Sequence, residues 1–439
     1  MNIDTEFLRP QKAEALKNIH SDIKKKSRDS AECYRNATVL PVKKIEGDDL
    51  AFGRGGVTDE YGLYIENSQT NGRVRGKYTV IDEDIAFRDE KVVYCGFLVN
   101  HWGHFLIEAV GRIWFCLEEN DADKYIFTVE YNSKRKLHKG NNYYEFLRLS
   151  GILDKAEVIN VPVKFREVIV PDSSCEGSEF GPGYKRVFDV IVKNALKEQG
   201  SVHYNNFSGN NIFLTRSSFK KARRFEFGMD MLDDYFLKNG FEVMCPEKMN
   251  LAELIWLLNN AKVCACVSGT VPHNMLFAPD GMSLIIIEKT PRWNEFQAKV
   301  NVVRDLNVTY IDANYSLYPV IVGSGPFIYA FNNRLRSFTK KNNYHFPDKK
   351  YISKQYKRKC VGNYIKVYRR YYFYQWYVED WFSMFSDLWV EAYKETDEEV
   401  GGLLNGTEPV FVRDIFTFDF WRKRLVKVYK YMMGVYNRR

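Results

Sequence analysis

The sequence lacks several features that would decide its class at once. Its 439 residues include only 8 cysteines, and their spacing matches no disulfide framework. No apolar run approaches the ~18 residues that a membrane-spanning helix needs, and the densest, Ser283–Ile287, has the length of a strand. Residues 1–7 carry charge and no signal-peptide core. These absences argue against export, so we expect reduced cysteines and a cytoplasmic location.

Motifs for common cofactors and metals are also missing. The chain has no Gly-Lys-Ser/Thr loop and no Gly-x-Gly-x-x-Gly after a predicted strand, so nicotinamide or flavin binding has little support. Cys264 and Cys266 could share one face of a strand, but no second Cys/His pair at zinc spacing accompanies them, and we interpret them as small buried residues. Asp121 and Asp123 match an Asp-x-Asp pattern, yet they follow a helix end and read as a solvated turn. We expect no cofactor and no metal.

The composition that remains is that of a globular protein. Hydrophobic residues make up 45% and aromatic residues 15%, which excludes wholesale disorder and coiled-coil or collagen-like architectures. The length suits two domains better than one.

Strands and helices alternate most regularly between residues 211 and 314. The pattern predicts strands at 211–215, 241–245, 263–267, 283–287 and 308–311, with helices at 229–238, from Asn250, around 274–277 and at 293–306. Asn250 followed by Glu253 fits a capping box at the start of one helix. Such alternation with short connections is typical of a parallel sheet covered on both faces.

The upstream half shows a similar but looser pattern. Strands are expected at 91–94, 124–129, 158–159 and 168–170, and helices at 103–118, 143–149 and 185–198, with residues 1–90 forming accessory strands and turns. We therefore predict an α/β protein with two Rossmann-like domains that face each other across a cleft. Their bounds would be 1–185 and 186–325, followed by a helical extension over 326–439. Ligands would bind at the carboxyl ends of the strands.

The extension is strongly basic. Residues 334–377 hold thirteen Lys/Arg against one acidic residue, Asp348, and many aromatic residues lie between them. Near the end, the segment 418–432 predicts an amphipathic helix with one apolar aromatic side and one basic side. Three interpretations stay open: an anionic membrane surface, a terminal helix packed on the body, and single-stranded nucleic acid. The net charge of +8 leads us to expect the membrane and no nucleic acid.

Four stretches carry residues suited to chemistry. The first, Asn100–Glu108, places His101, Trp102, His104 and Glu108 at a strand-to-helix transition. His104 and Glu108 are four residues apart and would share a helix face, which offers a general base, although both histidines could instead satisfy buried backbone groups.

The other three stretches follow strands of the second half. Arg216, with Arg223 and Arg224 soon after, suits phosphate oxygens. Glu247 follows the second strand, at a position where a base or a sugar could be contacted. The loop 267–274 contains Ser268, Gly269, Thr270, His273 and Asn274, and it offers backbone amides at a helix start to an anion.

Together these stretches resemble glycosyltransferase family 61, from about Val93 to Glu288. Residues 100–108 are similar to the family's amino-terminal block of histidine and aromatic residues that ends in an acidic residue. Residues 213–216 with 222–224 resemble its strand-and-arginine block, and residues 240–247 through 269–277 resemble its carboxyl-terminal block. The order and spacing of the three blocks carry the resemblance.

The resemblance implies a GT-B type fold and an inverting transfer from a nucleotide sugar, with a UDP-sugar as the expected donor and no obligatory metal. Bacterial relatives act in capsule, exopolysaccharide and lipopolysaccharide synthesis, while others glycosylate proteins or plant cell-wall chains. Many relatives have a His-Gly pair where this sequence has Ser268-Gly269, so one donor contact is either lost or supplied by His273. Glu226 falls near the position of an Asn-Glu pair in many relatives, so that helix start is not carried over.

We therefore expect a glycosyltransferase at the cytoplasmic membrane surface that extends a lipid-linked glycan in surface polysaccharide synthesis. Glu108 or His104 would act as the base, with His101 and Trp102 on the acceptor side. The arginines, Glu247 and the loop 268–274 would bind the donor. Two alternatives stay open: a catalytically silent glycan-binding or scaffolding protein of a polysaccharide assembly system, and another nucleotide-sugar enzyme such as an epimerase.

Overall fold

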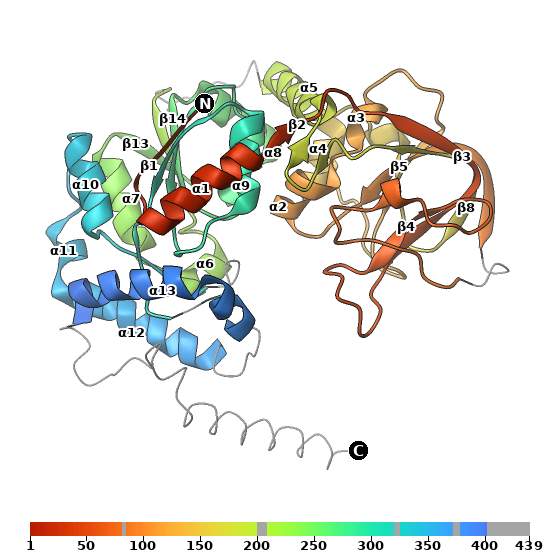
Figure 1. Cartoon of the computed structure of the whole chain (residues 1–439). Coiled ribbons are helices and arrows are strands. Elements are labelled where there is room, and N and C mark those ends of the chain that lie inside the picture. The colour runs from red at the N-terminus through yellow and green to blue at the C-terminus, as the bar shows by residue number, and fades with distance from the viewer. Residues whose placement is uncertain (81–84, 200–208, 319, 321–324, 372–377, 402–439) are drawn as a thin grey trace, which may run out of the picture.

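The computed structural model describes residues 1–80, 85–199, 209–318, 320, 325–371 and 378–401. The protein is α/β and forms two lobes, each built on a six-stranded sheet (Figure 1). We call the lobe of residues 31–180 the first lobe and the other the second lobe. The more specific GT-B arrangement remains a prediction.

The sheet of the second lobe is parallel throughout. Its order is β1 (Asn2–Phe7), β16 (Asn307–Ile311), β15 (Ser283–Ile287), β14 (Val263–Val267), β11 (Asn211–Leu214) and β13 (Phe241–Met244). The connections include α7 (Met229–Lys238), α8 (Leu251–Asn260), η6 (Val271–Phe277) and α9 (Glu295–Val303). The alternation predicted for residues 211–314 is confirmed.

The capping box of α8 is also confirmed. The side chain of Asn250 accepts a hydrogen bond from the Glu253 backbone N–H at 2.9 Å, and the Glu253 carboxylate accepts one from the Asn250 N–H at 2.9 Å. Both orphan donors at the helix start are therefore satisfied by residues three apart.

The start of the chain departs from the prediction. Residues 1–90 were expected on the first half, but β1 pairs with β16 at the edge of the second sheet, and Asn2 lies opposite Asn307. Helix α1 (Pro10–Asp22) packs on α9 in the same lobe, as the red elements of Figure 1 show. Local periodicity identifies a strand but not the sheet that it joins, so the sequence did not predict that β1 belongs to the second sheet.

The first lobe is a mixed sheet rather than a second parallel Rossmann-like sheet. Its order is β4 (Arg54–Thr58), β3 (Ala31–Lys43), β8 (Val163–Pro171), β5 (Ala86–Phe97), β6 (Lys124–Thr128) and β7 (Ala156–Ile159). The long strand β3 runs antiparallel to both β4 and β8, while β8, β5, β6 and β7 are parallel. The predicted strands of this half exist, and the antiparallel half of the sheet comes from the segment expected to form accessory strands.

The helix expected at 103–118 is broken into three pieces. They are α2 (Trp102–His104), the π-helical turn η3 (Phe105–Ala109) and α3 (Ile113–Cys116). The break falls at Gly111, where an added Cβ would lie 2.4 Å from Oγ of Ser173. The segment after β8 therefore packs closely against the chain in the gap between η3 and α3.

The two lobes share one continuous apolar core. Helices α4 (Asn142–Leu149), α5 (Pro182–Gln199) and α8 pack together between the sheets. The ring of Phe277 from the second lobe lies 6.3 Å from Phe146 of α4 and 5.2 Å from Phe188 of α5. The junction is thus filled by packed side chains on this side, which fixes how the two strand-end regions face each other.

Two small sheets and several short elements complete the described chain. One sheet joins β2 (Lys24–Lys25), β10 (Glu179–Phe180) and β9 (Cys175–Glu176), and the other joins β12 (Glu226–Phe227), β18 (Phe327–Tyr329) and β17 (Asn314–Tyr315). Short helices are η1 (Glu66–Ser68), η4 (Leu153–Lys155), α6 (Lys220–Phe225) and η5 (Pro246–Lys248).

The carboxyl-terminal helices pack on the second lobe. They are α10 (Asn333–Lys341), α11 (Lys349–Ile352), α12 (Lys354–Tyr371) and α13 (Val378–Val400). Leu335 and Phe338 of α10 join the same apolar cluster as Phe7 of β1, so α10 belongs to the lobe's core. The amphipathic helix predicted at 418–432 lies outside the described residues. Among the helices that are described, none has both the length and the apolar character to span a membrane.

Candidate active site

The histidine block forms a tight unit at the end of β5. His101 caps α2 through its ring nitrogen, which accepts a hydrogen bond from the His104 backbone N–H at 3.3 Å. His104 Nδ1 lies 2.7 Å from Oε2 of Glu108, so the predicted four-residue contact exists even though the turn is π-helical. Burial, together with the nearby charges of His104 and Lys221, lowers the pKa of His101.

Glu108 is almost fully buried, with 2% of its surface exposed. Its other oxygen, Oε1, receives Arg73 Nε at 2.6 Å and Asn71 Nδ2 at 2.8 Å. Burial alone would raise the pKa of this carboxyl, but the hydrogen bonds and charges of His104, Arg73 and Asn71 outweigh it and leave the pKa lowered. Glu108 is therefore held as a carboxylate, which makes it a weak base and a strong partner for the imidazole.

This pairing assigns different tasks to the two groups. A carboxylate on Nδ1 fixes the ring orientation of His104 and favours the proton on that nitrogen. The other nitrogen, Nε2, is then the one that can accept a proton from a substrate hydroxyl, and the carboxylate stabilises the imidazolium that results. Geometry and charge favour His104 as the base and Glu108 as its positioning residue.

Arg73 and Asn71 were not foreseen from the sequence. The loop that carries them is held by Arg112, a buried residue that donates to the carbonyl of Gln69 at 2.7 Å and to that of Asn67. The Arg73 guanidinium lies 5.7 Å from the Phe52 ring centroid and 5.5 Å from that of Phe296, which belongs to the second lobe. This loop has no regular sequence pattern, so nothing in the sequence indicated that Arg73 contacts Glu108.

The histidine block touches the loop after β14 directly. Trp102 Nε1 donates to Oδ1 of Asn274 at 2.9 Å. An added Cβ on Gly103 would lie 3.0 Å from Nδ1 of His273 and 3.1 Å from Oγ1 of Thr270. Two stretches predicted independently, one from each half of the chain, therefore meet at the junction of the lobes.

His273 is neutral in this setting. Burial, reinforced by the charges of His104 and His101, lowers the pKa of its ring to about 3. Its Nε2 lies 3.2 Å from Nδ2 of Asn294. An imidazole of this kind can position neighbouring groups but does not supply a positive charge to an anion at neutral pH.

Arg216 anchors a second cluster, at the carboxyl end of β11. Its Nε and Nη2 pair with the Glu226 carboxylate at 3.2 and 3.1 Å, and Glu226 also accepts from the hydroxyl of Tyr329 at 3.0 Å. Lys289, two residues after the end of β15, lies with its Nζ 4.0 Å from the same carboxylate. The resemblance assigned no role to Glu226. In the structure its carboxylate lies between the cations of this cluster, Arg216 and Lys289.

The loop at Gly269 connects the two clusters. An added Cβ at Gly269 would lie 3.2 Å from Nζ of Lys289, and its φ of +131° is one that side-chain-bearing residues rarely adopt. The next residue, Thr270, lies against Gly103 of the histidine block. Lys221 of α6 is close enough to lower the pKa of His101. The cations of the second lobe and the histidines of the first therefore flank one short loop.

The comparisons with known proteins address this same region. Residues 102–285 match the family model Glycosyltransferase 61. The matched segment includes His104, Glu108, Arg216 and the Gly269 loop, whereas Arg73 and Lys289, which complete the two clusters, lie outside it. No curated protein matches the chain.

Three predicted donor residues of the family 61 segment lie outside the two clusters. Arg223 and Arg224 are exposed on α6, and Arg223 Nε donates to the carbonyl of Ser217 at 2.7 Å. Glu247 is exposed on η5 beyond β13, an edge strand. Ser268, by contrast, is buried beside the cluster, and its Oγ accepts from the Lys289 N–H at 3.3 Å. Donor contacts by the three exposed residues remain a prediction.

A buried ion network lies beyond the family 61 match, at the ends of β15 and β16. Lys12 of α1 has no exposed surface, and its Nζ lies 2.9 Å from Oε2 of Glu288, 2.9 Å from Oδ1 of Asp312 and 2.8 Å from the Thr290 carbonyl. Arg9 pairs with the other oxygen of Asp312 at 3.3 Å. The network ties the first helix to the second sheet.

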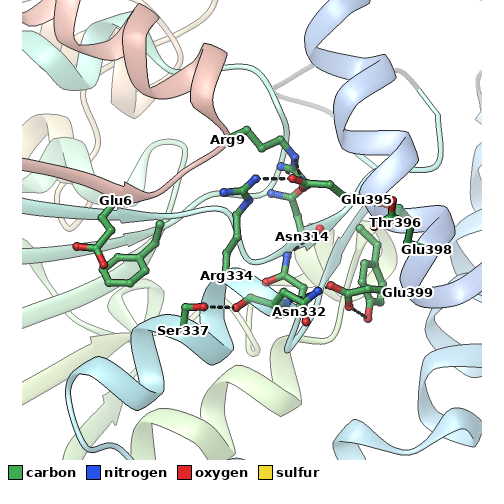
Figure 2. Close-up of a pocket in the computed structure, with 13 residues that line it drawn as sticks. Glu6, Arg9, Asn314, Asn332, Arg334, Ser337, Glu395, Thr396, Glu398 and Glu399 are labelled. Atoms are coloured by element: carbon green, nitrogen blue, oxygen red, sulfur yellow. Dashed lines mark hydrogen bonds and ion pairs between the residues drawn. The ribbon is translucent and has the colours of Figure 1, made fainter.

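A cavity of about 340 Å³ opens where α13 meets the second lobe (Figure 2). It is lined by Glu6, Phe7, Arg9, Asn314, Tyr315, Asn332, Asn333, Arg334, Ser337, Glu395, Thr396, Glu398 and Glu399, none of them a predicted site residue. Arg9 and Arg334 approach the same carboxylate, Glu395, and Glu399 accepts from the Tyr315 hydroxyl at 2.9 Å. These contacts hold α13 in place.

Within the described ranges, no three His, Cys, Asp or Glu side chains are grouped so as to hold a metal ion. Asp121 is mostly exposed and pairs with Lys91 at 2.7 Å. Cys264 and Cys266 are buried thiols of β14. Independence from metals remains a prediction.

Proposed function

We propose that the protein is an inverting glycosyltransferase that moves a sugar from a nucleotide sugar, with a UDP-sugar as the expected donor, to a glycan acceptor in surface polysaccharide synthesis. One observation carries the proposal: the block that holds the His104–Glu108 pair, in the segment that matches family 61, contacts the Gly269 loop, and the buried ammonium group of Lys289 lies beside the same loop. A base and an anion site at one junction are what this transfer needs.

The reaction assigns one role to each cluster. The acceptor hydroxyl attacks the anomeric carbon on the face opposite the leaving diphosphate, and His104 Nε2 takes the hydroxyl proton as the new C–O bond forms. Glu108 stabilises the resulting imidazolium. The bond between the anomeric carbon and the diphosphate oxygen breaks, and the charge on the diphosphate is met by Arg216 and the backbone amides at Gly269 and Thr270. His101 and Trp102 lie on the acceptor side.

The experiment that tests the proposal combines binding with turnover. A thermal-shift panel of nucleotide sugars should reveal stabilisation by a specific donor, because a ligand that binds only the folded state raises its stability. Product analysis with that donor and a lipid-linked glycan should then show transfer. Binding without transfer or donor hydrolysis would favour a silent scaffolding protein, and an isomerised donor without transfer would indicate an epimerase.

Arg216 offers a direct test of the donor site. Arg216→Ala should weaken binding of nucleoside diphosphates by roughly 10- to 100-fold, since a charge-assisted contact to phosphate is lost. Titration calorimetry measures this, with Arg166→Ala, an exposed arginine of the first lobe, as the matched control. Arg216→Lys should retain part of the affinity. Unchanged affinity in a folded Arg216→Ala protein would remove Arg216 from the donor site.

The location at an anionic membrane, through the basic carboxyl-terminal segment, is also a proposal. Its support is the charge of residues 334–377 and the amphipathic pattern at 418–432. Deleting the segment after Asp414 should abolish cosedimentation with liposomes rich in phosphatidylglycerol, while neutral liposomes bind neither protein. Equal cosedimentation of the full and truncated chains would favour the packed-helix interpretation, and binding to single-stranded oligonucleotides would favour the third.

A further inference from the structure

Lys289 is a buried lysine at a place where ligands of parallel sheets bind. It lies two residues after the end of β15, and its side chain is 6% exposed. The carboxyl ends of β14 and β15 are neighbours, so Lys289 lies beside Gly269, with Nζ 3.2 Å from the position of a Cβ there. Because Gly269 has no side chain, the loop places no Cβ at that position next to the ammonium group.

The charge of Lys289 is incompletely compensated. Among the described residues, Glu226 has the only carboxylate within 4.0 Å of Nζ, and that carboxylate already binds Arg216 through two nitrogens. On the opposite side Nζ lies 4.4 Å from the Phe327 ring centroid. A buried ammonium normally has closer partners than these, and an anion near Gly269 would provide them.

We propose that Lys289 binds the donor's diphosphate beside Gly269, together with Arg216. This inference rests on the proposed function and adds to it a residue that no sequence pattern assigned. It also answers the departure at Ser268, where many relatives carry histidine. His273 is neutral and packed against Gly103, so it does not supply the missing positive charge. Lys289 supplies this charge, and its backbone N–H donates to Oγ of Ser268.

The surroundings of Lys289 make its charge sensitive to pH. Burial lowers its pKa to about 8. Glu226 and Glu288 act to raise the pKa, and Arg216 and Lys221 act to lower it. The protonated form, which binds an anion, is therefore dominant below about pH 8 and is lost above it. Diphosphate affinity should therefore fall as the pH rises from 7.5 to 9.5, and the Lys289→Arg variant serves as the control for titration of the probes themselves.

Titration calorimetry with UDP, GDP and inorganic pyrophosphate at these two pH values tests the proposal. Lys289→Met should lower affinity by roughly 10- to 100-fold at pH 7.5 and abolish most of the pH dependence. Lys289→Arg should keep its affinity at pH 9.5, because arginine stays charged. Lys238→Met, which changes an exposed lysine of α7, serves as the matched control and should behave as the wild type does.

Each outcome has a distinct meaning. If Lys289→Met binds like the wild type while Arg216→Ala is weakened, Lys289 is structural and the inference fails, but the proposed function stands. If the wild type binds none of the three probes, both the inference and the proposed function fail. If Lys289→Met does not fold, as judged by circular dichroism, the wild-type pH profile decides. Wild-type affinity that changes with pH no more than the affinity of Lys289→Arg does overturns the inference.

Discussion

Replacing His104 by glutamine is expected to lower kcat by about 10²–10⁴-fold and to leave nucleoside diphosphate affinity within about twofold. Glutamine can still donate to the Glu108 carboxylate, so that Glu108 is not left without its 2.7 Å partner. It has no nitrogen that accepts a proton near neutral pH. Steady-state transfer rates and calorimetry on the same protein separate the two effects.

The controls follow from the pairing of His104 with Glu108. His138→Gln changes an exposed histidine of the first lobe and should leave kcat unaltered. Glu108→Gln should also lower kcat strongly, and the double variant should lose little more, because the two groups act as one unit. Losses that multiply in the double variant would contradict the division into base and positioning residue. A large loss of diphosphate affinity in His104→Gln would place the residue in the donor site instead.

The second large effect concerns stability. Lys12→Met should lower the free energy of unfolding by about 3–5 kcal/mol, because it removes the cation between two buried carboxylates, Glu288 and Asp312. Denaturant titration followed by circular dichroism measures it. Lys17→Met on the exposed side of α1 is the matched control and should change stability by less than about 0.5 kcal/mol.

The loss in Lys12→Met should depend on pH in a defined direction. Burial already raises the pKa of Glu288, and removing Lys12 raises it further. A carboxyl whose folded pKa lies above its unfolded value favours folding at low pH and loses that contribution as pH rises. The difference between wild type and variant should therefore be larger at pH 8 than at pH 5. A variant as stable as the wild type at pH 8 would show that the network contributes no net stability.

The features that could be predicted from the sequence depend on neighbours within a few residues. Two such features exist in the structure. The capping box joins Asn250 to Glu253, three residues later, and the histidine–carboxylate contact joins His104 to Glu108, four residues later. The alternating series from 211 to 314 also follows from local periodicity. Its strands end on one edge of the sheet, which is why Arg216 and Gly269 were expected to be close.

The features that escaped prediction depend on distant parts of the chain. Arg73 reaches Glu108 from a loop without regular structure, and Lys12 meets Asp312 from a helix 300 positions earlier. No local pattern marks either residue. Lys289 did leave a signal, since it lies two residues after the apolar strand Ser283–Ile287, just as Arg216 lies two residues after the strand Asn211–Leu214. Reading every strand end for cations would have found it.

The pairing of β1 with β16 has a consequence for synthesis of the protein. Because Asn2 lies opposite Asn307, the first strand leaves the ribosome long before its partner exists. The intervening first lobe can complete its own sheet meanwhile, since β3 to β8 are contiguous in the chain. During translation β1 therefore has no partner strand until residues 307–311 have emerged, so the second sheet is completed last.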